Sequence, residues 1–161
     1  MSELMGVINL IREPDELETL TAGRCLGAVP FGGRYRLIDF ALSNMVRAGV
    51  SRVAVFAHTK YRALMDHLGS GKHWDLHHRK GSLFILPPAD ADPFEAGRGD
   101  LFHFRRNLDY FHRSGAAYVV VSRSHAVCNL DLRAALDAHK ASGADVTVVC
   151  KRTSDLLGGK A

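Results

Sequence analysis

A short run of glycine and arginine, PFGGRYR at residues 30–36, is the part of the sequence best suited to bind an anion. Gly32 and Gly33 predict a tight loop whose backbone amides can approach a ligand, and Arg34 and Arg36 add positive charge beside it. These groups suit a ligand that carries phosphate. A plain turn with solvated arginines explains the same residues equally well.

A second stretch, INLIREPDELETLT at residues 8–21, has the opposite character. It begins in an apolar run that predicts a strand and continues into a loop where an α/β nucleotide-binding protein would carry glycines and a basic residue. This loop instead carries four acidic residues, Glu13, Asp15, Glu16 and Glu18. Acidic side chains repel a triphosphate at close range, so the loop argues against phosphate binding.

Apolar runs alternate with segments of helical period, the order typical of a parallel sheet covered by helices on both faces. The predicted strands span residues 5–11, 52–57, 82–86, 117–122 and 145–150. The predicted helices span residues 35–48, 60–68, 100–113 and 129–141, and glycines suited to left-handed caps follow them: Gly49, Gly69, Gly115 and Gly143. The run AAYVVVS at residues 116–122 predicts a central strand that is covered on both faces.

Ligands in such sheets bind beyond the carboxyl ends of the strands, which directs attention to the loops that follow them. These loops span residues 12–34, 58–60, 87–99 and 123–129, and the length of the loop at 87–99 is typical of a functional or mobile segment. His125 is the histidine best placed for a pocket. It could contact a ligand phosphate or simply hydrogen-bond to the backbone.

Composition excludes several classes of function. The 161 residues, 47% of them hydrophobic, suit a globular domain, and no run of about 18 apolar residues could span a bilayer. With no secretory signal we expect a cytoplasmic protein without a membrane partner. The net charge of +4 is spread along the chain, which argues against nucleic acid. The three cysteines are predicted to be reduced and buried, and neither they nor His73 and His77 indicate a metal site.

The string AVPFGGRYRLIDFALSNMVRAG at residues 28–49 resembles the sugar-nucleotide pyrophosphorylases, and most closely the glucose-1-phosphate adenylyltransferase family. YRALMDHLGSGKHWDL at residues 61–76 and SHAVCNLDLRAALDAHKASGADVTV at residues 124–148 fall in register with that family, so the resemblance covers nearly the whole chain. It implies a three-layer, Rossmann-like α/β nucleotidyltransferase domain with a mainly parallel sheet. Residues 1–161 would be its N-terminal portion, in a longer protein that adds a C-terminal β-helix.

The resemblance also implies how active members hold their ligands. After the first strand they read GGxGxRLxPLT and then KPAVPFGG; the glycine amides hold the nucleotide phosphates, and the arginine and lysine neutralise charge as the sugar phosphate attacks ATP. In this sequence the glycines fall on Ile11, Arg12 and Pro14, the arginine on Glu16, and the lysine and the proline after it on Leu26 and Gly27. Every phosphate-facing group of the loop is therefore replaced.

Two further positions depart from the active pattern. After the fourth strand active members read GDH, and the aspartate holds the catalytic magnesium that acts with ATP. This chain has Arg123-Ser124-His125, and serine beside arginine is a poor magnesium ligand. Near Arg98-Gly99, the preceding aromatic pair is replaced by Ala96-Gly97 and the following threonine by Asp100.

These replacements, at Glu16, Leu26 and Ser124 above all, predict a subunit with no catalytic residue, no metal and no cofactor of its own. The resemblance leaves a vestigial ligand pocket for a sugar phosphate or nucleotide, formed by Gly32, Gly33, Arg34, Arg36, Arg98, Gly99 and His125. Arg24 lies in a stretch that the resemblance links to anionic activators, so it is a candidate effector contact.

The sequence therefore resembles the regulatory, non-catalytic subunits of the family more than its catalytic members. It predicts a protein of glycogen biosynthesis that forms a heterotetramer with a catalytic glucose-1-phosphate adenylyltransferase subunit and biases ADP-glucose formation. One alternative is an active adenylyltransferase that makes ADP-glucose and pyrophosphate from ATP and glucose 1-phosphate. Another is a binding module that senses a sugar phosphate or nucleotide through Arg34, Arg36 and Arg98.

Overall fold

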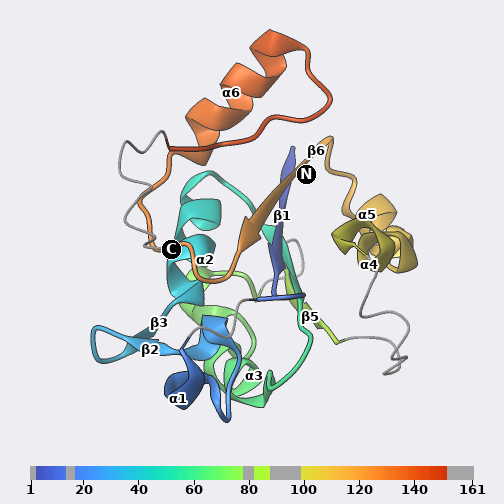
Figure 1. The fold of residues 1–161 in the computed structure, drawn as a ribbon. Coiled ribbons are helices and arrows are strands. Elements are labelled where there is room, and N and C mark those ends of the chain that lie inside the picture. The colour runs from blue at the N-terminus through green and yellow to red at the C-terminus, as the bar shows by residue number, and fades with distance from the viewer. Residues whose placement is uncertain (1–2, 14–16, 78–81, 88–98, 152–161) are drawn as a thin grey trace, which may run out of the picture. The chain divides into compact units, whose positions relative to one another are not determined.

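The computed structural model describes residues 3–13, 17–77, 82–87 and 99–151 (Figure 1). The chain divides into two compact units, residues 1–130 and residues 131–161. The larger unit contains the sheet and the strand ends at which a ligand site was predicted.

A parallel sheet of four strands forms the centre of the larger unit. The strands β1 (Leu4–Asn9), β4 (Arg52–Phe56), β5 (Ser82–Leu86) and β6 (Tyr118–Arg123) lie in the order β5-β4-β1-β6. All neighbouring pairs are parallel, with Gly6 opposite Val53 on one side of β1 and opposite Val120 on the other. Four of the five predicted strands are thus confirmed, and their carboxyl ends share one edge of the sheet.

Alternate residues of β1 pack against helices on opposite faces of the sheet. Met5 and Val7 belong to a buried cluster that packs against Phe104 and Phe111. These aromatic residues come from α4 (Asp100–Arg106) and α5 (Leu108–Ser114). A side chain at Gly6 would instead meet Met45, which lies on α2 (Ile38–Arg47). Figure 1 shows α2 on one side of the sheet and α4 and α5 on the other, which confirms the three-layer α/β fold.

Helix α2 forms because its apolar residues recur at helical spacing. Ile38, Leu42 and Met45 lie on one stripe of the helix and are fully buried. The helix starts later than the predicted residue 35, because Tyr35–Arg36 form strand β3, which pairs with β2 (Pro30–Phe31) in a small hairpin. It is followed by Gly49 at a φ of 81°, and the other three predicted cap glycines also adopt positive φ.

Short helices complete the larger unit, and one predicted helix is broken. The additional elements are α1 (Glu18–Thr21), η1 (Leu26–Ala28), α3 (Arg62–Leu68) and η2 (Lys72–Trp74). The predicted helix at residues 100–113 divides into α4 and α5 at Asn107, whose backbone leaves the helical region at a φ of −114°. The Asn107 side-chain amide donates to the His103 carbonyl at 3.0 Å. This side-chain bond competes with the backbone hydrogen bonds that a continuous helix would need.

The smaller unit contains one helix, α6 (Leu132–Ser142), among its described residues. It starts after the predicted residue 129 because the Asp131 carboxylate accepts hydrogen bonds from the backbone amides of Arg133 and Ala134, and so caps the helix. The strand predicted at residues 145–150 is wrong. Val146 and Val148 are 77% and 78% exposed, and no described strand pairs with this segment, so its backbone has no ladder to join.

Two predictions about burial are also wrong. Strand β6 is an edge strand of the described sheet, and Val119 and Val121 on one of its faces are 45% and 52% exposed. The cysteines are not buried, since Cys25 is half-buried and Cys128 and Cys150 are exposed.

No helix in the described ranges is long and apolar enough to cross a membrane.

The hydroxyl of Tyr110 gives a first test of the packing between α5 and the sheet. The ring meets Phe84 edge-on at 5.2 Å, but the hydroxyl is buried without a hydrogen-bond partner among the described residues. Burial raises the pKa of Tyr110 to about 12. We expect Tyr110→Phe to increase the free energy of unfolding by about 1 kcal/mol, because it removes an unsatisfied polar group.

Urea denaturation of both proteins measures this change. Tyr35→Phe is the matched control, because the Tyr35 side chain is about half exposed and its hydroxyl can bond to water. That control is expected to change stability by less than about 0.5 kcal/mol. A loss of stability in Tyr110→Phe would contradict the packing described here.

Candidate functional site

The turn after β1 contains a residue other than glycine in the left-handed backbone conformation. Arg12 has a φ of 56°, in the left-handed region that favours glycine. The resemblance places one of the glycines of the active pattern at this position. The glycine is therefore replaced, but the turn that it would serve is still made.

This turn directs the next residue, Glu13, into the protein interior. Its side chain is only 7% exposed, and its Oε1 atom accepts a hydrogen bond from the Ser124 hydroxyl. Nδ1 of His125 lies 3.8 Å from Oε1. Burial raises the pKa of Glu13 above its ordinary value of 4.5, while the Ser124 hydrogen bond and the charge of His125 act in the opposite direction.

Gly27 and Ser124 pack directly against each other beneath this carboxylate. Ser124 is fully buried, and a Cβ atom placed on Gly27 would lie 2.6 Å from its hydroxyl oxygen. No side chain fits between the η1 turn and the residue after β6 without displacing one of them. The glycine at position 27 therefore lets the turn approach Ser124.

Arg123 connects the end of β6 to two other segments. Its Nη1 atom donates to the Ile11 carbonyl at 2.6 Å, and its Nη2 atom donates to the Asp100 carboxylate at 3.1 Å. Both side chains of the ion pair are more than 30% exposed, so the charge attraction itself contributes modestly. The arrangement fixes the loop after β1 and the start of α4 against the end of β6.

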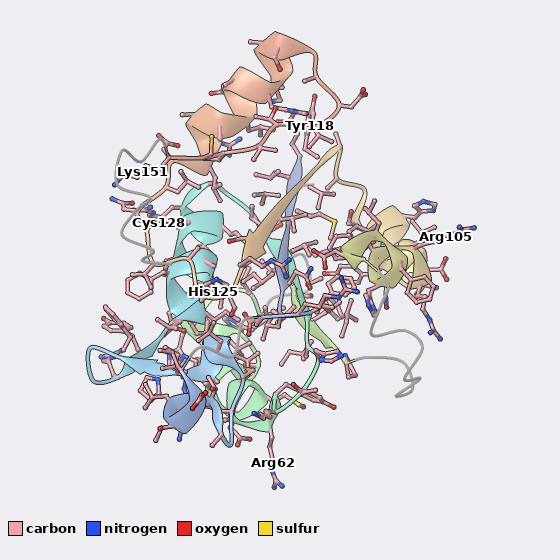
Figure 2. All side chains as sticks on the ribbon, viewed as in Figure 1. Arg62, Arg105, Tyr118, His125, Cys128 and Lys151 are labelled. Carbon is pink, nitrogen blue, oxygen red and sulfur yellow. The ribbon has the colours of Figure 1, made fainter. Side chains whose placement is uncertain are left out.

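The rest of the loop after β6 is held by Asn44 of α2. The Asn44 side-chain nitrogen donates to the Cys128 carbonyl at 2.9 Å, and its oxygen accepts from Arg47 and from the Leu130 amide. Figure 2 shows Cys128 beside α2 and His125 at the turn that follows β6. This loop is therefore anchored at both ends, by Arg123 before Ser124 and by Asn44 after His125.

Several of the predicted pocket residues lie in or beside the hairpin of β2 and β3. Gly32, Gly33 and Arg34 are exposed in the turn between β2 and β3, where Arg34 lies over the ring of its neighbour Tyr35. Arg36 donates to the Ala28 carbonyl at 2.8 Å. Among the described residues, none of these contacts reaches the Glu13 carboxylate.

The remaining predicted site residues differ in their burial and in their contacts. His125 is the one predicted pocket residue that contacts Glu13 in the described structure. Gly99 is exposed at the start of α4, Arg24 is half-buried, and Leu26 is buried at 8% exposure, so its side chain belongs to the core. Arg98 and Glu16 lie outside the described residues.

Sequence reasoning missed the part that Glu13 plays. It counted Glu13 only as one of four charges that repel phosphate, whereas the side chain points inward and bonds to Ser124. Residues 13 and 124 are far apart along the chain, and no periodicity connects them. The available signal was that two loops at neighbouring strand ends both depart from the active pattern.

The raised pKa of Glu13 predicts a pH dependence of stability. The folded chain holds this proton more tightly than the unfolded chain, so ionising Glu13 costs folded-state stability. Its contribution is fully present below about pH 4.5, the ordinary value, and is lost as the pH rises through the raised folded pKa. Glu13→Gln is expected to remove this part of the pH profile.

Denaturation of both proteins at a series of pH values tests this expectation. The wild-type protein should lose stability relative to Glu13→Gln as the pH rises from 4.5 toward neutral. Glu18→Gln, on the exposed surface of α1, serves as the control and should not change the profile. Parallel profiles for wild type and Glu13→Gln would contradict a raised pKa.

The described residues do not fit a magnesium ion at this edge of the sheet. Two carboxylates of the described loops there, Glu13 and Asp100, are engaged by Ser124 and Arg123 respectively. Mg²⁺ requires several oxygen ligands, and the Arg123 guanidinium adds positive charge beside them. No group of three or more His, Cys, Asp or Glu residues that could hold a metal occurs in the described ranges.

Comparison with known proteins agrees with this fold. Residues 15–156 match the sequence profile of the nucleotidyl transferase family. The chain belongs to this family. A solved nucleotidyltransferase-like structure also superimposes on 86% of the chain with a TM-score of 0.66, at 16% identity. It is a Bacillus anthracis protein described as a glucose-1-phosphate thymidylyltransferase in complex with sucrose, and the chain covers 50% of it.

Within the nucleotidyl transferase family, the chain is similar to two kinds of characterised protein. It is 49% identical over 148 residues to the glycogen biosynthesis protein GlgD of Bacillus subtilis, with 92% of this chain and 43% of that protein covered. It is 45% identical to GlgD of Geobacillus stearothermophilus, with 96% and 46% covered. The glucose-1-phosphate adenylyltransferase of Thermotoga neapolitana is 34% identical, with 93% and 36% covered. The chain therefore spans less than half the length of these relatives.

Proposed function

We propose that this protein is a regulatory, non-catalytic subunit that acts with a glucose-1-phosphate adenylyltransferase in the formation of ADP-glucose for glycogen. The observation that carries the proposal is that Ser124 and Arg123, which both depart from the active pattern, are engaged by contacts within the chain. Ser124 bonds to Glu13, and Arg123 pairs with Asp100. The former pocket is rebuilt as a set of internal contacts rather than left as damaged.

The first of these contacts removes the metal position. Active members, as the resemblance implies, hold magnesium through an aspartate where this chain has Ser124. Here the Ser124 hydroxyl is fully buried and donates its hydrogen to Glu13, so its lone pairs face no open site. Adenylyl transfer needs charge neutralisation at the phosphates, and a serine engaged with an internal carboxylate does not supply it.

The second contact joins two neighbouring segments, the loop after β1 and the start of α4. Arg123 replaces a glycine of the active pattern, and its guanidinium reaches both the Ile11 carbonyl and the Asp100 carboxylate. Asp100 replaces a threonine of the same pattern. An arginine between the loop after β1 and α4 is bound to the protein at both ends, and it is not free to neutralise a ligand.

The similarity to GlgD supports the place in glycogen biosynthesis, because the identity to those proteins is 45–49% and exceeds the 34% to an adenylyltransferase. A protein that keeps the family fold without its catalytic groups can act by binding a catalytic partner and favouring one of its states. We place this assembly, a heterotetramer with the catalytic subunit, in the cytoplasm, where ADP-glucose would be made. No cofactor is needed for this role.

The experiment is a measurement of pyrophosphate release from ATP and glucose 1-phosphate. The full-length protein is assayed alone, and then mixed with a catalytic subunit from the same organism. We expect no release above background from the protein alone, and a changed rate or effector response of the partner in the mixture. Turnover by the protein alone, at a rate near that of the partner, would establish the alternative of an active adenylyltransferase.

A further inference from the structure

The hairpin of β2 and β3 is too short to hold its own position. Each strand has two residues, and the turn between them contains Gly32 and Gly33, which have positive φ and open space around them. An isolated two-stranded hairpin is at best marginally stable in water. Its place is therefore set by contacts with α2, where Phe31 meets the Phe40 ring edge-on at 5.2 Å and Asp39 lies at the hairpin base.

The Asp39 carboxylate makes a different contact with each of its oxygens. It lies in the first turn of α2, and its side chain is 9% exposed. Oδ2 accepts a hydrogen bond from the backbone amide of Arg36, the last residue of β3, at 3.0 Å. Oδ1 lies 2.7 Å from Nε2 of His67, near the end of α3. An ionised carboxylate only accepts, so Nε2 of His67 donates to it.

The contact with Asp39 continues through His67 to η2. The His67 side chain is 18% exposed, and its ring meets the indole of Trp74 edge-on, with 5.9 Å between the ring centres. Trp74 is the last residue of η2, and its backbone amide bonds to the Gly71 carbonyl at 3.1 Å. His67 is thus held between a carboxylate of α2 and an aromatic ring of η2. Water competes little with a hydrogen bond in such a partly buried place.

A carboxylate held at both oxygens has one orientation, and the loss of either donor lets it turn. We propose that Asp39 and His67 form a bridge that couples the β2–β3 hairpin to α3 and η2. Release of His67 loosens the hairpin at Arg36, and distortion of the hairpin loosens η2 at Trp74, because coupling between two places is reciprocal. This inference does not depend on the regulatory role, since it concerns only contacts within the chain.

The first test breaks the bridge at α3 and observes the hairpin. Amide hydrogen exchange is measured residue by residue in the full-length protein. We expect His67→Leu to accelerate exchange at the Arg36 amide about tenfold, because the Asp39 carboxylate loses its second donor. His67→Gln keeps an N–H donor and should restore slow exchange. His73→Leu is the matched control, because the His73 ring also meets Trp74 edge-on, at 6.0 Å, without a bond to Asp39 in the described structure.

The second test distorts the hairpin and observes η2. Gly33 has a φ of 91°, which side chains other than glycine rarely adopt, so Gly33→Val strains the turn without a steric clash. We expect it to accelerate exchange at the Trp74 amide about threefold when His67 is present, and to have no such effect in combination with His67→Leu. Gly23→Val is the control, because it adds the same side chain in open space where φ is not positive.

Several outcomes overturn the proposal. An unchanged Arg36 amide in His67→Leu means that the bridge does not hold the hairpin, and equal acceleration at every amide means a general loss of stability. An effect of Gly33→Val on Trp74 that persists without His67 means that another path connects them. If His67→Leu does not fold, Asp39→Asn takes its place, since its single carbonyl oxygen replaces two acceptors and should loosen Arg36 or Trp74. Failure of both variants to fold also counts against a local bridge.

Discussion

Ser124→Asp is expected to lower the free energy of unfolding by about 3 kcal/mol at neutral pH, although it restores the residue of the active pattern. Ser124 is fully buried and donates to the Glu13 carboxylate. An aspartate there replaces that donor with a second negative charge in hydrogen-bond range of the first. Two buried carboxylates in contact cannot both ionise without a large cost. We also expect no gain in ATP affinity.

Denaturation curves and calorimetry with ATP and magnesium measure both parts of this prediction. Ser124→Asn is the matched control, because asparagine has nearly the same shape as aspartate without its charge and should be less destabilising. Adding Glu13→Gln to Ser124→Asp removes the repulsion and should recover about half of the loss. Tighter ATP binding by Ser124→Asp alone would mean that the pocket is only damaged, and would contradict the rebuilt site.

The sheet could be predicted from the sequence because its signals are local. Strands β1, β4, β5 and β6 are short apolar runs, and their parallel arrangement follows from the alternation of helices and strands along the chain. The valine-rich segment at residues 145–150 has the same local signal but forms no strand. Strand formation needs a partner backbone as well as propensity, and propensity is all that a single segment reveals.

The site could be predicted only in part. The loops that follow the strands were identified, and so were the replacements at Ser124 and Arg123. The contact between Ser124 and Glu13 was not, because the two residues meet only when β1 and β6 lie side by side. Glycines and arginines attract attention in a sequence, yet Gly32 and Arg34 lie in an exposed hairpin turn. The residue that contacts both Ser124 and His125 is Glu13, whose burial no sequence pattern predicted.

Gly27→Ala is expected to destabilise the protein by about 2 kcal/mol, whereas the same change at an ordinary helical position stabilises a helix. The new methyl group would lie 2.6 Å from the hydroxyl oxygen and 2.7 Å from the Cβ atom of Ser124, both in the buried interior. Either the η1 turn or the loop after β6 must move. Either movement also disturbs the bond between Ser124 and Glu13.

Urea denaturation in a double-mutant cycle separates this contact from a general effect of residue 27. Gly23→Ala is the control, because a Cβ atom at Gly23 meets nothing within 4 Å, and it should change stability by less than about 0.5 kcal/mol. Ser124→Gly removes both atoms that the methyl group meets, so its combination with Gly27→Ala should be at least about 1 kcal/mol more stable than the sum of the single losses predicts. Additive losses would show that the turn and the loop do not touch. A favourable coupling would show that glycine is required at position 27 because Ser124 occupies the space beside it.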